Sequence, residues 1–150
     1  MRRSGFFRDA GPRTRRLAAF LKKRSRTAPE RRPTLDCETF PQLFRKHAVV
    51  FTDTDDFTIQ VARHGILHFL MLFDRLVAAA APGIARAGGE IVKVEGDSLL
   101  LRFDDVGAAC AGIDAIEASL RRVNRGRPQD ERLAFSYGVG FGDILDLEAD

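Results

Sequence analysis

Two aspartates stand beside short apolar segments, and of all the residues in this sequence they are the best suited to chemistry. Asp53 follows the β-branched and aromatic run of residues 48–52, which is typical of a buried strand. Asp97 follows Gly96 in a Gly-Asp pair that separates two further strand-like segments. Carboxylate oxygens are the ligands that hard divalent cations prefer. The pair therefore predicts a metal site, provided that the fold brings the two residues together.

The segments around these aspartates have clear hydrophobic periodicities. Alternation of apolar and polar residues indicates a strand, whereas apolar residues at spacings of three and four indicate one face of a helix. Pro82 is expected to kink or end the first long helix, and Gly142-Asp143 is expected to turn the chain into a possible fifth strand. The predicted elements are a strand over 48–53, a helix face from Ile66 to Ala80, a hairpin over 90–95 and 98–103, a helix over 106–123 and a strand over 132–141.

The order strand, helix, strand, strand, helix, strand is that of a ferredoxin-like βαββαβ core, an α+β fold with an antiparallel sheet. In this topology the first and third strands are antiparallel neighbours in the centre of the sheet, so the end of the first lies beside the start of the third. Asp53 and Asp97 are therefore expected to meet at one edge of the sheet.

Three segments resemble the catalytic domain of class III nucleotidyl cyclases, the adenylate and guanylate cyclases. The first is Phe51-Thr-Asp-Thr-Asp-Asp-Phe-Thr, and the second is Gly88-Gly-Glu-Ile-Val-Lys-Val-Glu-Gly-Asp-Ser. A weaker third match is Tyr137-Gly-Val-Gly-Phe-Gly-Asp-Ile. All three occur in the order of the family, and together they span about residues 47–147.

The resemblance implies cyclisation of a nucleoside triphosphate to a 3′,5′-cyclic nucleotide and pyrophosphate. Two Mg²⁺ or Mn²⁺ ions would be held by Asp53, Asp97 and the backbone carbonyl of Thr54. Further nucleotide-binding residues implied by the family motifs are Phe57, Thr58, Lys93 and Gly96. A Lys at the base-reading position accompanies adenine in the family, so ATP is favoured over GTP. The family builds its sites between two chains, which implies a homodimer or a pairing with another cyclase-like chain.

The sequence departs from the family pattern in two places. Asp56 stands where the family usually has a small residue, and with Asp53 and Asp55 it is expected to put three carboxylates beside the triphosphate. The sequence also ends at Asp150, before the family segment that carries a second base-reading residue and the Asn and Arg of catalysis. The domain is therefore expected to be incomplete at its C-terminal end. A non-catalytic cyclase-like interaction or regulatory module is the alternative function.

Each assigned residue has a simpler structural explanation. Asp53 could cap the helix that follows it, Asp97 could occupy only a hairpin turn, and Lys93 could be an exposed strand residue. Cys110 is expected in the core. Another palm-type enzyme, such as a diguanylate cyclase, would share the topology, but the Gly-Gly-acidic-acidic-Phe hairpin of that class is replaced here by Val-Glu-Gly-Asp-Ser.

Charge divides the chain into a basic arm, residues 1–46, and a cyclase-like domain, residues 47–150. Residues 1–48 carry 14 Lys and Arg against 4 Asp and Glu, whereas residues 49–150 carry 10 against 17. Within residues 1–35, the breakers Gly5, Gly11, Pro12, Pro29 and Pro33 are expected to confine any helix to about residues 14–25. This short basic amphipathic helix could contact an anionic membrane or serve as a solvated linker. Nothing in the arm favours sequence-specific nucleic-acid binding.

Two distant cysteines, Cys37 and Cys110, form no metal or disulfide pattern, which favours a reduced, cytoplasmic setting. The longest apolar stretch, residues 66–73, is too short to predict a membrane span. The expected location is therefore cytoplasmic, with membrane association left open through the basic arm.

Overall fold

The computed structural model describes residues 11–145 of the 150-residue chain. The described residues form two compact units, one of residues 11–46 with 143–145 and one of residues 47–142. Each unit is described by itself below. The second unit holds the segments that carry the predicted site.

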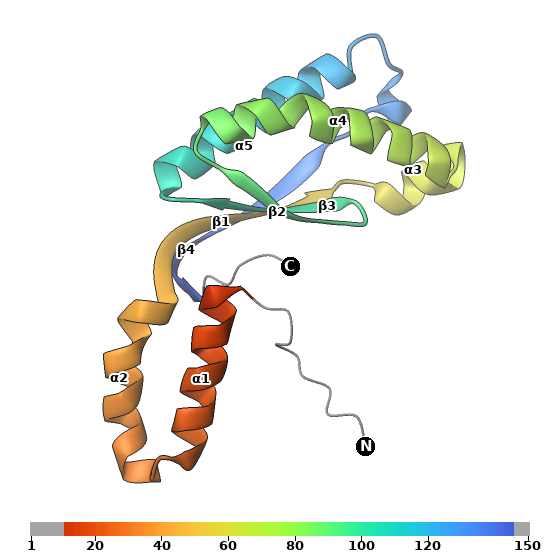
Figure 1. Cartoon of the computed structure of the whole chain (residues 1–150). Coiled ribbons are helices and arrows are strands. Elements are labelled where there is room, and N and C mark those ends of the chain that lie inside the picture. Colours follow the sequence, from red (N-terminus) through yellow and green to blue (C-terminus); the bar gives the residue numbers. More distant parts are fainter. Residues whose placement is uncertain (1–10, 146–150) are drawn as a thin grey trace. The chain divides into compact units, whose positions relative to one another are not determined.

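The first unit contains a helical hairpin, labelled α1 and α2 in Figure 1, which we call the α1–α2 hairpin. Helix α1 spans Pro12–Arg26, a 3₁₀ turn spans Pro29–Arg31, and helix α2 spans Arg32–Leu43. The helix expected over about residues 14–25 is present as α1, whereas α2 was not expected, since Pro29 and Pro33 were expected to end the helical part of this region. Proline is compatible with the first turn of a helix, where the backbone N–H has no intrahelical partner. Pro29 begins the 3₁₀ turn, and Pro33 is the second residue of α2.

A four-stranded sheet forms the base of the second unit, and its order is β2-β3-β1-β4. The strands are β1 Phe44–Thr54, β2 Glu90–Glu95, β3 Ser98–Phe103 and β4 Phe135–Leu145. β1 and β3 are antiparallel neighbours with Phe51 opposite Leu100, and β2 and β3 form the predicted hairpin. The predicted α+β, ferredoxin-like core with an antiparallel sheet is confirmed. The expected turn at Gly142-Asp143 was wrong, because β4 runs through these residues without interruption.

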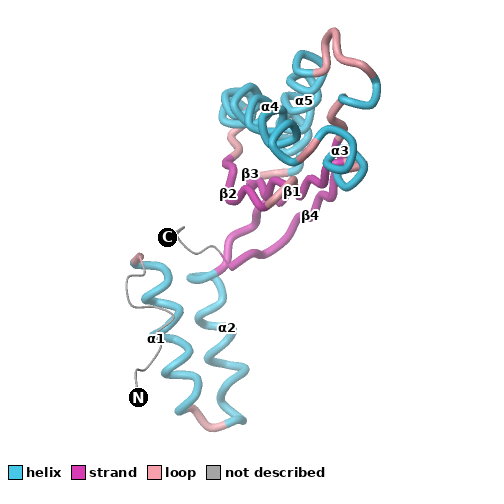
Figure 2. The backbone as a smooth tube through the Cα atoms, turned by 90° about the vertical axis from the view of Figure 1, so that its right-hand side faces the viewer, coloured by secondary structure: helices cyan, strands magenta, loops and turns pink. Residues whose placement is uncertain are grey.

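Three helices cover one face of this sheet, as Figures 1 and 2 show. They are α3 Phe57–His64, α4 Ile66–Arg86 and α5 Val106–Val123, and a 3₁₀ turn, Gln129–Glu131, precedes β4. Helix α4 continues four residues past Pro82, so the proline does not end it. A proline this close to a helix end removes a single backbone hydrogen bond from the last turns.

The core lies between the helices and the sheet, and it leaves part of α4 uncovered. Phe69, Leu72 and Leu76 of α4 pack in the core, whereas Ile66 and Leu70 of the predicted face are exposed. With Leu67, which is 78% exposed, they make α4 apolar on more than one side. By length and composition α4 is apolar enough to cross a membrane, but its buried face supplies the core of this unit.

Two glycines allow an aromatic ring to seat at the centre of the unit. A Cβ atom at Gly89 or at Gly112 would collide with the ring of Phe103, which is 1% exposed. The β3 ring therefore fits into space left by the start of β2 and the middle of α5. Cys110 of α5 is exposed, so its predicted place in the core was wrong.

Candidate functional site

The pairing of β1 with β3 brings Asp53 and Asp97 to the same edge of the sheet. The hydroxyl of Ser98 donates to Oδ1 of Asp53 over 3.3 Å, and the hydroxyl of Thr54 donates to the backbone carbonyl of Asp97 over 2.7 Å. Further along the same two strands, the backbone N–H of Leu99 on β3 donates to the hydroxyl of Thr52 on β1 over 2.9 Å. These three bonds tie the end of β1 to the start of β3 and fix the distance between the two aspartates.

The turn after β1 places the N-terminus of α3 beside Asp53 and Asp97. Asp56 precedes α3 with φ of 57°, and it is the one non-glycine residue with positive φ in the described chain. The first intrahelical bond runs from the N–H of Gln60 to the carbonyl of Asp56 over 2.9 Å. The N–H groups of Phe57 and Thr58 precede that bond and are free of the α3 ladder, as the first amides of any helix are. Such amides are suited to phosphate oxygens.

These residues line one open pocket of about 500 Å³. Its walls come from the end of β1, the turn before β3 and the start of α3, and they include Asp53, Thr54, Phe57, Thr58 and Asp97. Within residues 11–145 no group of three His, Cys, Asp or Glu side chains is arranged to hold a metal ion. The oxygen donors that line this pocket are the carboxylates of Asp53, Asp56 and Asp97, together with hydroxyl and backbone carbonyl oxygens. Oxygen donors of this kind fit Mg²⁺ or Mn²⁺, which keep part of their coordination for water and phosphate.

Asp53 and Asp55 have separate structural roles that the sequence did not distinguish. Asp53 does not cap α3, because Asp56 occupies the cap position. The carboxylate of Asp55 accepts a hydrogen bond from the hydroxyl of Ser136 on β4 over 2.7 Å. Three carboxylates of this segment were expected beside a triphosphate. Asp53 and Asp56 line the pocket, but Asp55 does not, because its carboxylate is bonded to β4.

Lys93 and Gly96 belong to the β2–β3 hairpin. Gly96 has φ of 62°, a conformation that glycine adopts without steric cost in a two-residue turn, and this turn presents Asp97. Lys93 is exposed on β2, and its ammonium pairs with the carboxylate of Glu95 over 2.8 Å. Neither Lys93 nor Gly96 lines the pocket of the two aspartates.

The third predicted motif contributes structure near the site. The hydroxyl of Tyr137 on β4 donates to the carboxylate of Glu117 on α5 over 2.7 Å. Burial, followed by this hydrogen bond and the negative charges of Glu117 and Asp55, raises the pKa of Tyr137 well above its usual range. The phenol is therefore a fixed hydrogen-bond donor between β4 and α5.

Sequence reasoning missed Thr52 and Ser98. Each is a small residue with a hydroxyl group, next in sequence to a predicted metal ligand. This neighbouring position is the only feature of the sequence that could have pointed to them. Their bonds cross from one strand to another, so they depend on the register, which adjacent residues do not reveal.

No protein-family model matches the sequence, and no curated protein matches it. Solved structures do match. An adenylate/guanylate cyclase/hydrolase from Silicibacter pomeroyi is 30% identical with a TM-score of 0.57, and the match covers 71% of this chain and 62% of that chain. The guanylyl cyclase Cya2 is 21% identical with a TM-score of 0.57, and the match covers 67% of this chain and 55% of that one.

A third similar structure is a bacterial light-regulated adenylyl cyclase, 16% identical with a TM-score of 0.61. The match covers 92% of this chain and 44% of that chain, so it includes most of the α1–α2 hairpin. This chain thus spans 62% of the first of the three structures and smaller shares of the other two.

Proposed function

Because the chain has a class III nucleotidyl cyclase-like fold, we propose that it takes part in cyclic nucleotide synthesis in cytoplasmic signalling. Its substrate would be a nucleoside triphosphate, with ATP favoured over GTP. In this reaction the ribose 3′-oxygen forms a bond to the α-phosphorus, the bond from that phosphorus to the β-phosphate oxygen breaks, and pyrophosphate leaves. The chain supplies the metal-binding half of such a site.

The observation that carries this proposal is the meeting of Asp53 and Asp97 at the N-terminus of α3. Asp53 lies on β1 and Asp97 in the turn before β3. The hydroxyl of Ser98 donates to one carboxylate oxygen of Asp53, and the hydroxyl of Thr54 donates to the backbone carbonyl of Asp97 rather than to its carboxylate. The amides of Phe57 and Thr58 begin the adjacent helix and are suited to the phosphates. Anionic ligands for cations and N–H donors for phosphate thus share one pocket.

Asp53, Asp97 and the carbonyl of Thr54 would hold two Mg²⁺ or Mn²⁺ ions. Such ions activate the attacking hydroxyl and offset the charge that develops on the triphosphate. Ser98 orients the carboxylate of Asp53 through its hydroxyl, and Thr54 ties the turn at Asp97 to β1. These residues keep the cation ligands in place before any nucleotide binds.

Homodimerisation is part of the proposal, and two features support it. Lys93 lies outside the pocket of its own chain, so it reads a base only if it serves the pocket of a partner. Phe51 is 50% exposed although its neighbours Val50 and Thr52 are fully buried, so it projects from the sheet face opposite the core. Exposed aromatic residues on a sheet face are suited to protein contacts.

A non-catalytic cyclase-like module is the second candidate. The ion pair of Lys93 with Glu95 occupies the proposed base-reading group. Asp56 adds a negative charge to a pocket meant for a triphosphate. Both features favour a domain that keeps the fold and pairs with another cyclase-like chain.

Binding of a fluorescent ATP analogue with Mn²⁺ tests the proposal, and cyclic AMP formation is the second readout. We expect binding by the wild-type chain and its loss in Asp53→Asn and in Asp97→Asn. Asp74→Asn, which changes an exposed carboxylate on α4, is the matched control and should bind as the wild type does. If Mn²⁺ leaves nucleotide binding unchanged in all four proteins, the proposed function is wrong.

The choice between the two candidates needs a separate measurement. Cyclic AMP formed by a dimer of this chain, or by a mixture with a second cyclase-like chain, favours the enzyme. Pairing with such a chain without nucleotide affinity favours the module. For base choice, Lys93→Glu is expected to shift the ratio of ATP to GTP affinity toward GTP, whereas Lys22→Glu on α1 should leave it unchanged.

A further inference from the structure

A polar residue occupies the most buried position of helix α3. Gln60 is 6% exposed and is the one residue that α3 buries fully, whereas its apolar neighbour Ile59 is 50% exposed. Moving an amide group from water into a protein interior costs free energy unless its polar atoms are hydrogen-bonded. The burial of Gln60 therefore needs an explanation other than packing.

The amide group of Gln60 is bonded on one side only. Its Nε2 group donates to the backbone carbonyl of Arg132 over 2.7 Å, whereas its Oε1 atom is buried and has no hydrogen-bond partner among the described residues. An apolar side chain of the same size would lose the one bond, but it would bury no unbonded oxygen. Glutamine thus adds little to stability at this position, and what it does add is the connection to Arg132.

That connection is one of three between the turn after β1 and the segment that enters β4. The backbone N–H of Asp55 donates to the carbonyl of Ala134 over 2.9 Å, and the hydroxyl of Ser136 donates to the carboxylate of Asp55 over 2.7 Å. The bonding residues 132, 134 and 136 alternate with Leu133 and Phe135, which are buried in the core. Because an extended chain repeats every two residues, the three bonds use the positions that the core leaves free.

These bonds determine where the first amides of α3 lie. The backbone N–H of Gln60 donates to the carbonyl of Asp56, a residue of the pocket, over 2.9 Å. Gln60 is therefore joined to the pocket through its backbone and to the β4 segment through its side chain. Phe57 and Thr58 lie between Asp56 and Gln60, so a displacement of Gln60 would also displace their N–H groups.

We propose that Gln60 is a positioning residue for the triphosphate. By tying the first turn of α3 to the segment that enters β4, it keeps the N–H groups of Phe57 and Thr58 where phosphate oxygens bind. The inference rests on the proposed function and deepens it, because Gln60 is not among the residues that line the pocket. Gln60 acts through the helix and not by contact with the nucleotide.

The competing explanation is that Gln60 serves only the stability of α3. This helix has eight residues, and Nε2 of His64 lies 3.2 Å from the carbonyl of Asp130, so a second contact attaches its other end. A bond that serves only the fold would affect unfolding and metal binding together with phosphate binding. A positioning bond is expected to affect phosphate binding alone.

The substitution Gln60→Met in the full chain separates the two explanations. Methionine has a similar length and packs well among apolar groups, but it cannot donate to the carbonyl of Arg132. We expect the affinity for the complex of Mn²⁺ with inorganic tripolyphosphate to fall about fivefold, the change that one hydrogen bond typically brings. The affinity for Mn²⁺ alone and the midpoint of urea denaturation should stay as in the wild type. Isothermal titration calorimetry measures both affinities.

Two further variants and a second readout complete the experiment. Ser136→Ala removes another of the three bonds at an exposed position, and it should weaken tripolyphosphate binding by a smaller factor. Gln42→Met is the matched control, because it makes the same substitution at an exposed position of α2, and it should bind as the wild type does. In the ligand-free chain, hydrogen exchange should show that the amides of residues 55 and 60 lose protection in Gln60→Met.

The positioning role is overturned if Gln60→Met and Ser136→Ala both keep the wild-type affinity for Mn²⁺-tripolyphosphate. It is also overturned if Gln60→Met weakens Mn²⁺ binding and stability in parallel with tripolyphosphate binding, because glutamine then serves only the fold. Failure of the proposed function has a different signature: the wild-type chain itself would bind neither Mn²⁺-tripolyphosphate nor nucleotide, which would overturn both proposals together.

Discussion

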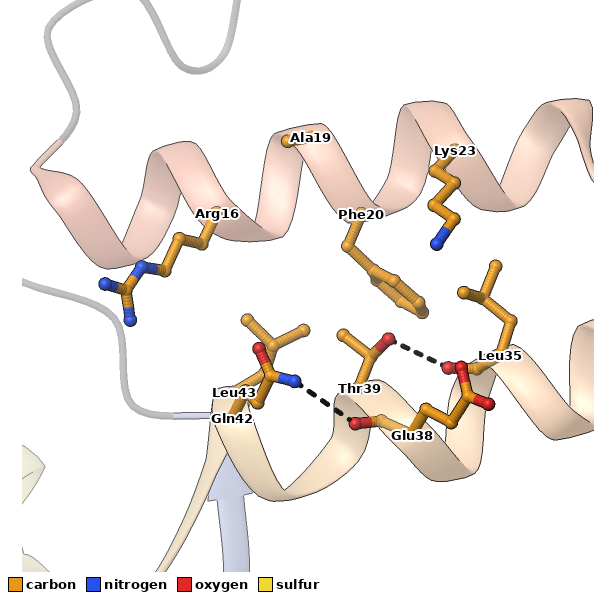
Figure 3. A pocket seen from close by; sticks show the side chains of 9 residues that line it. All are labelled: Arg16, Ala19, Phe20, Lys23, Leu35, Glu38, Thr39, Gln42 and Leu43. Atoms are coloured by element: carbon orange, nitrogen blue, oxygen red, sulfur yellow. Dashed lines mark hydrogen bonds between the residues drawn. The ribbon is translucent and has the colours of Figure 1, made fainter.

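The second unit, residues 47–142, which we call the cyclase-like unit, and the α1–α2 hairpin differ in how their side chains are packed. In the cyclase-like unit a four-stranded sheet and three helices enclose a continuous core, and the ring of Phe103 fits between Gly89 and Gly112. In the hairpin two helices are joined by the ion pair of Arg24 with Asp36 and leave an open groove. The first region encloses a continuous buried core, although part of α4 and one sheet face stay exposed, whereas the second leaves a groove of about 380 Å³ open between its two helices (Figure 3).

The same difference applies to the candidate site. The bonds of Thr52, Thr54 and Ser98 fix the pocket from within its own unit. The hairpin depends on few internal contacts. The pocket and the hairpin therefore differ in how firmly their own internal contacts hold them.

Gly112→Ala should have the largest effect on stability, because it tests whether the cyclase-like unit is as closely packed as the structure indicates. The added methyl group would collide with the buried ring of Phe103. We expect the free energy of unfolding to fall by about 1–3 kcal/mol, measured by urea denaturation.

Two controls sharpen this test. Gly107→Ala is on the same helix, and its Cβ would meet only the side chain of Asp105. It should leave stability unchanged or raise it, since alanine is the better helix former. Ala19→Met adds volume to the groove of the hairpin and should cost little. A large loss in Ala19→Met would contradict the contrast between the two regions.

Thr52→Val should have the next largest effect, and it links packing to the site. The substitution keeps the shape of the side chain but leaves the buried N–H of Leu99 without its acceptor. We expect a loss of roughly 1–3 kcal/mol and weaker Mn²⁺ binding, because β1 and β3 lose a bond beside the two aspartates. Thr34→Val, on the exposed side of α2, should change neither quantity. Mn²⁺ titration and urea denaturation measure both.

Asp56→Gly should have a smaller effect on the free energy of unfolding, and it tests whether the positive φ of Asp56 costs stability. Glycine adopts positive φ without steric cost, so stability is expected to rise by up to about 1 kcal/mol. Removing the carboxylate should also strengthen nucleotide binding several-fold, since like charges repel. Asp56→Asn separates the two causes, because it removes the charge and keeps a side chain. Equal stability gains in both variants would show that charge, not conformation, is responsible.

Hydrophobic periodicity was sufficient to predict the fold because the core uses it directly. Helix α5 has the bounds that its apolar spacing predicted. The Gly96-Asp97 pair correctly predicted the turn of the β2–β3 hairpin. The meeting of Asp53 with Asp97 followed from the topology alone, since neighbouring antiparallel strands bring their opposite ends together.

The remaining features depend on contacts that periodicity does not encode. Pro33 is typical of a helix breaker in the sequence, but it lies in the first turn of α2, where proline is tolerated. Cys110 lies among apolar residues of α5 yet is exposed, because the helix buries only one side. Asp55 and Asp56 are adjacent and chemically alike, and only the turn geometry separates the β4-bonded residue from the pocket-lining one.

The smallest expected effect concerns pH and is confined to the hairpin. The hydrogen bond from Arg24 lowers the pKa of the Asp36 carboxyl below its ordinary value of 3.8. A carboxyl whose pKa is lower in the folded state adds stability above its unfolded-state pKa, and this stability is lost as the pH falls through the lowered value. The hairpin is therefore expected to lose helix signal below about pH 4 while the cyclase-like unit keeps its shifts, measured by NMR chemical shifts of α1 and α2. Asp36→Asn should remove this pH dependence, and Glu30→Gln, in the adjoining turn, should retain it. If Asp36→Asn titrates as the wild type does, the ion pair does not join the helices, and the packing of Leu35 and Leu43 must hold them together.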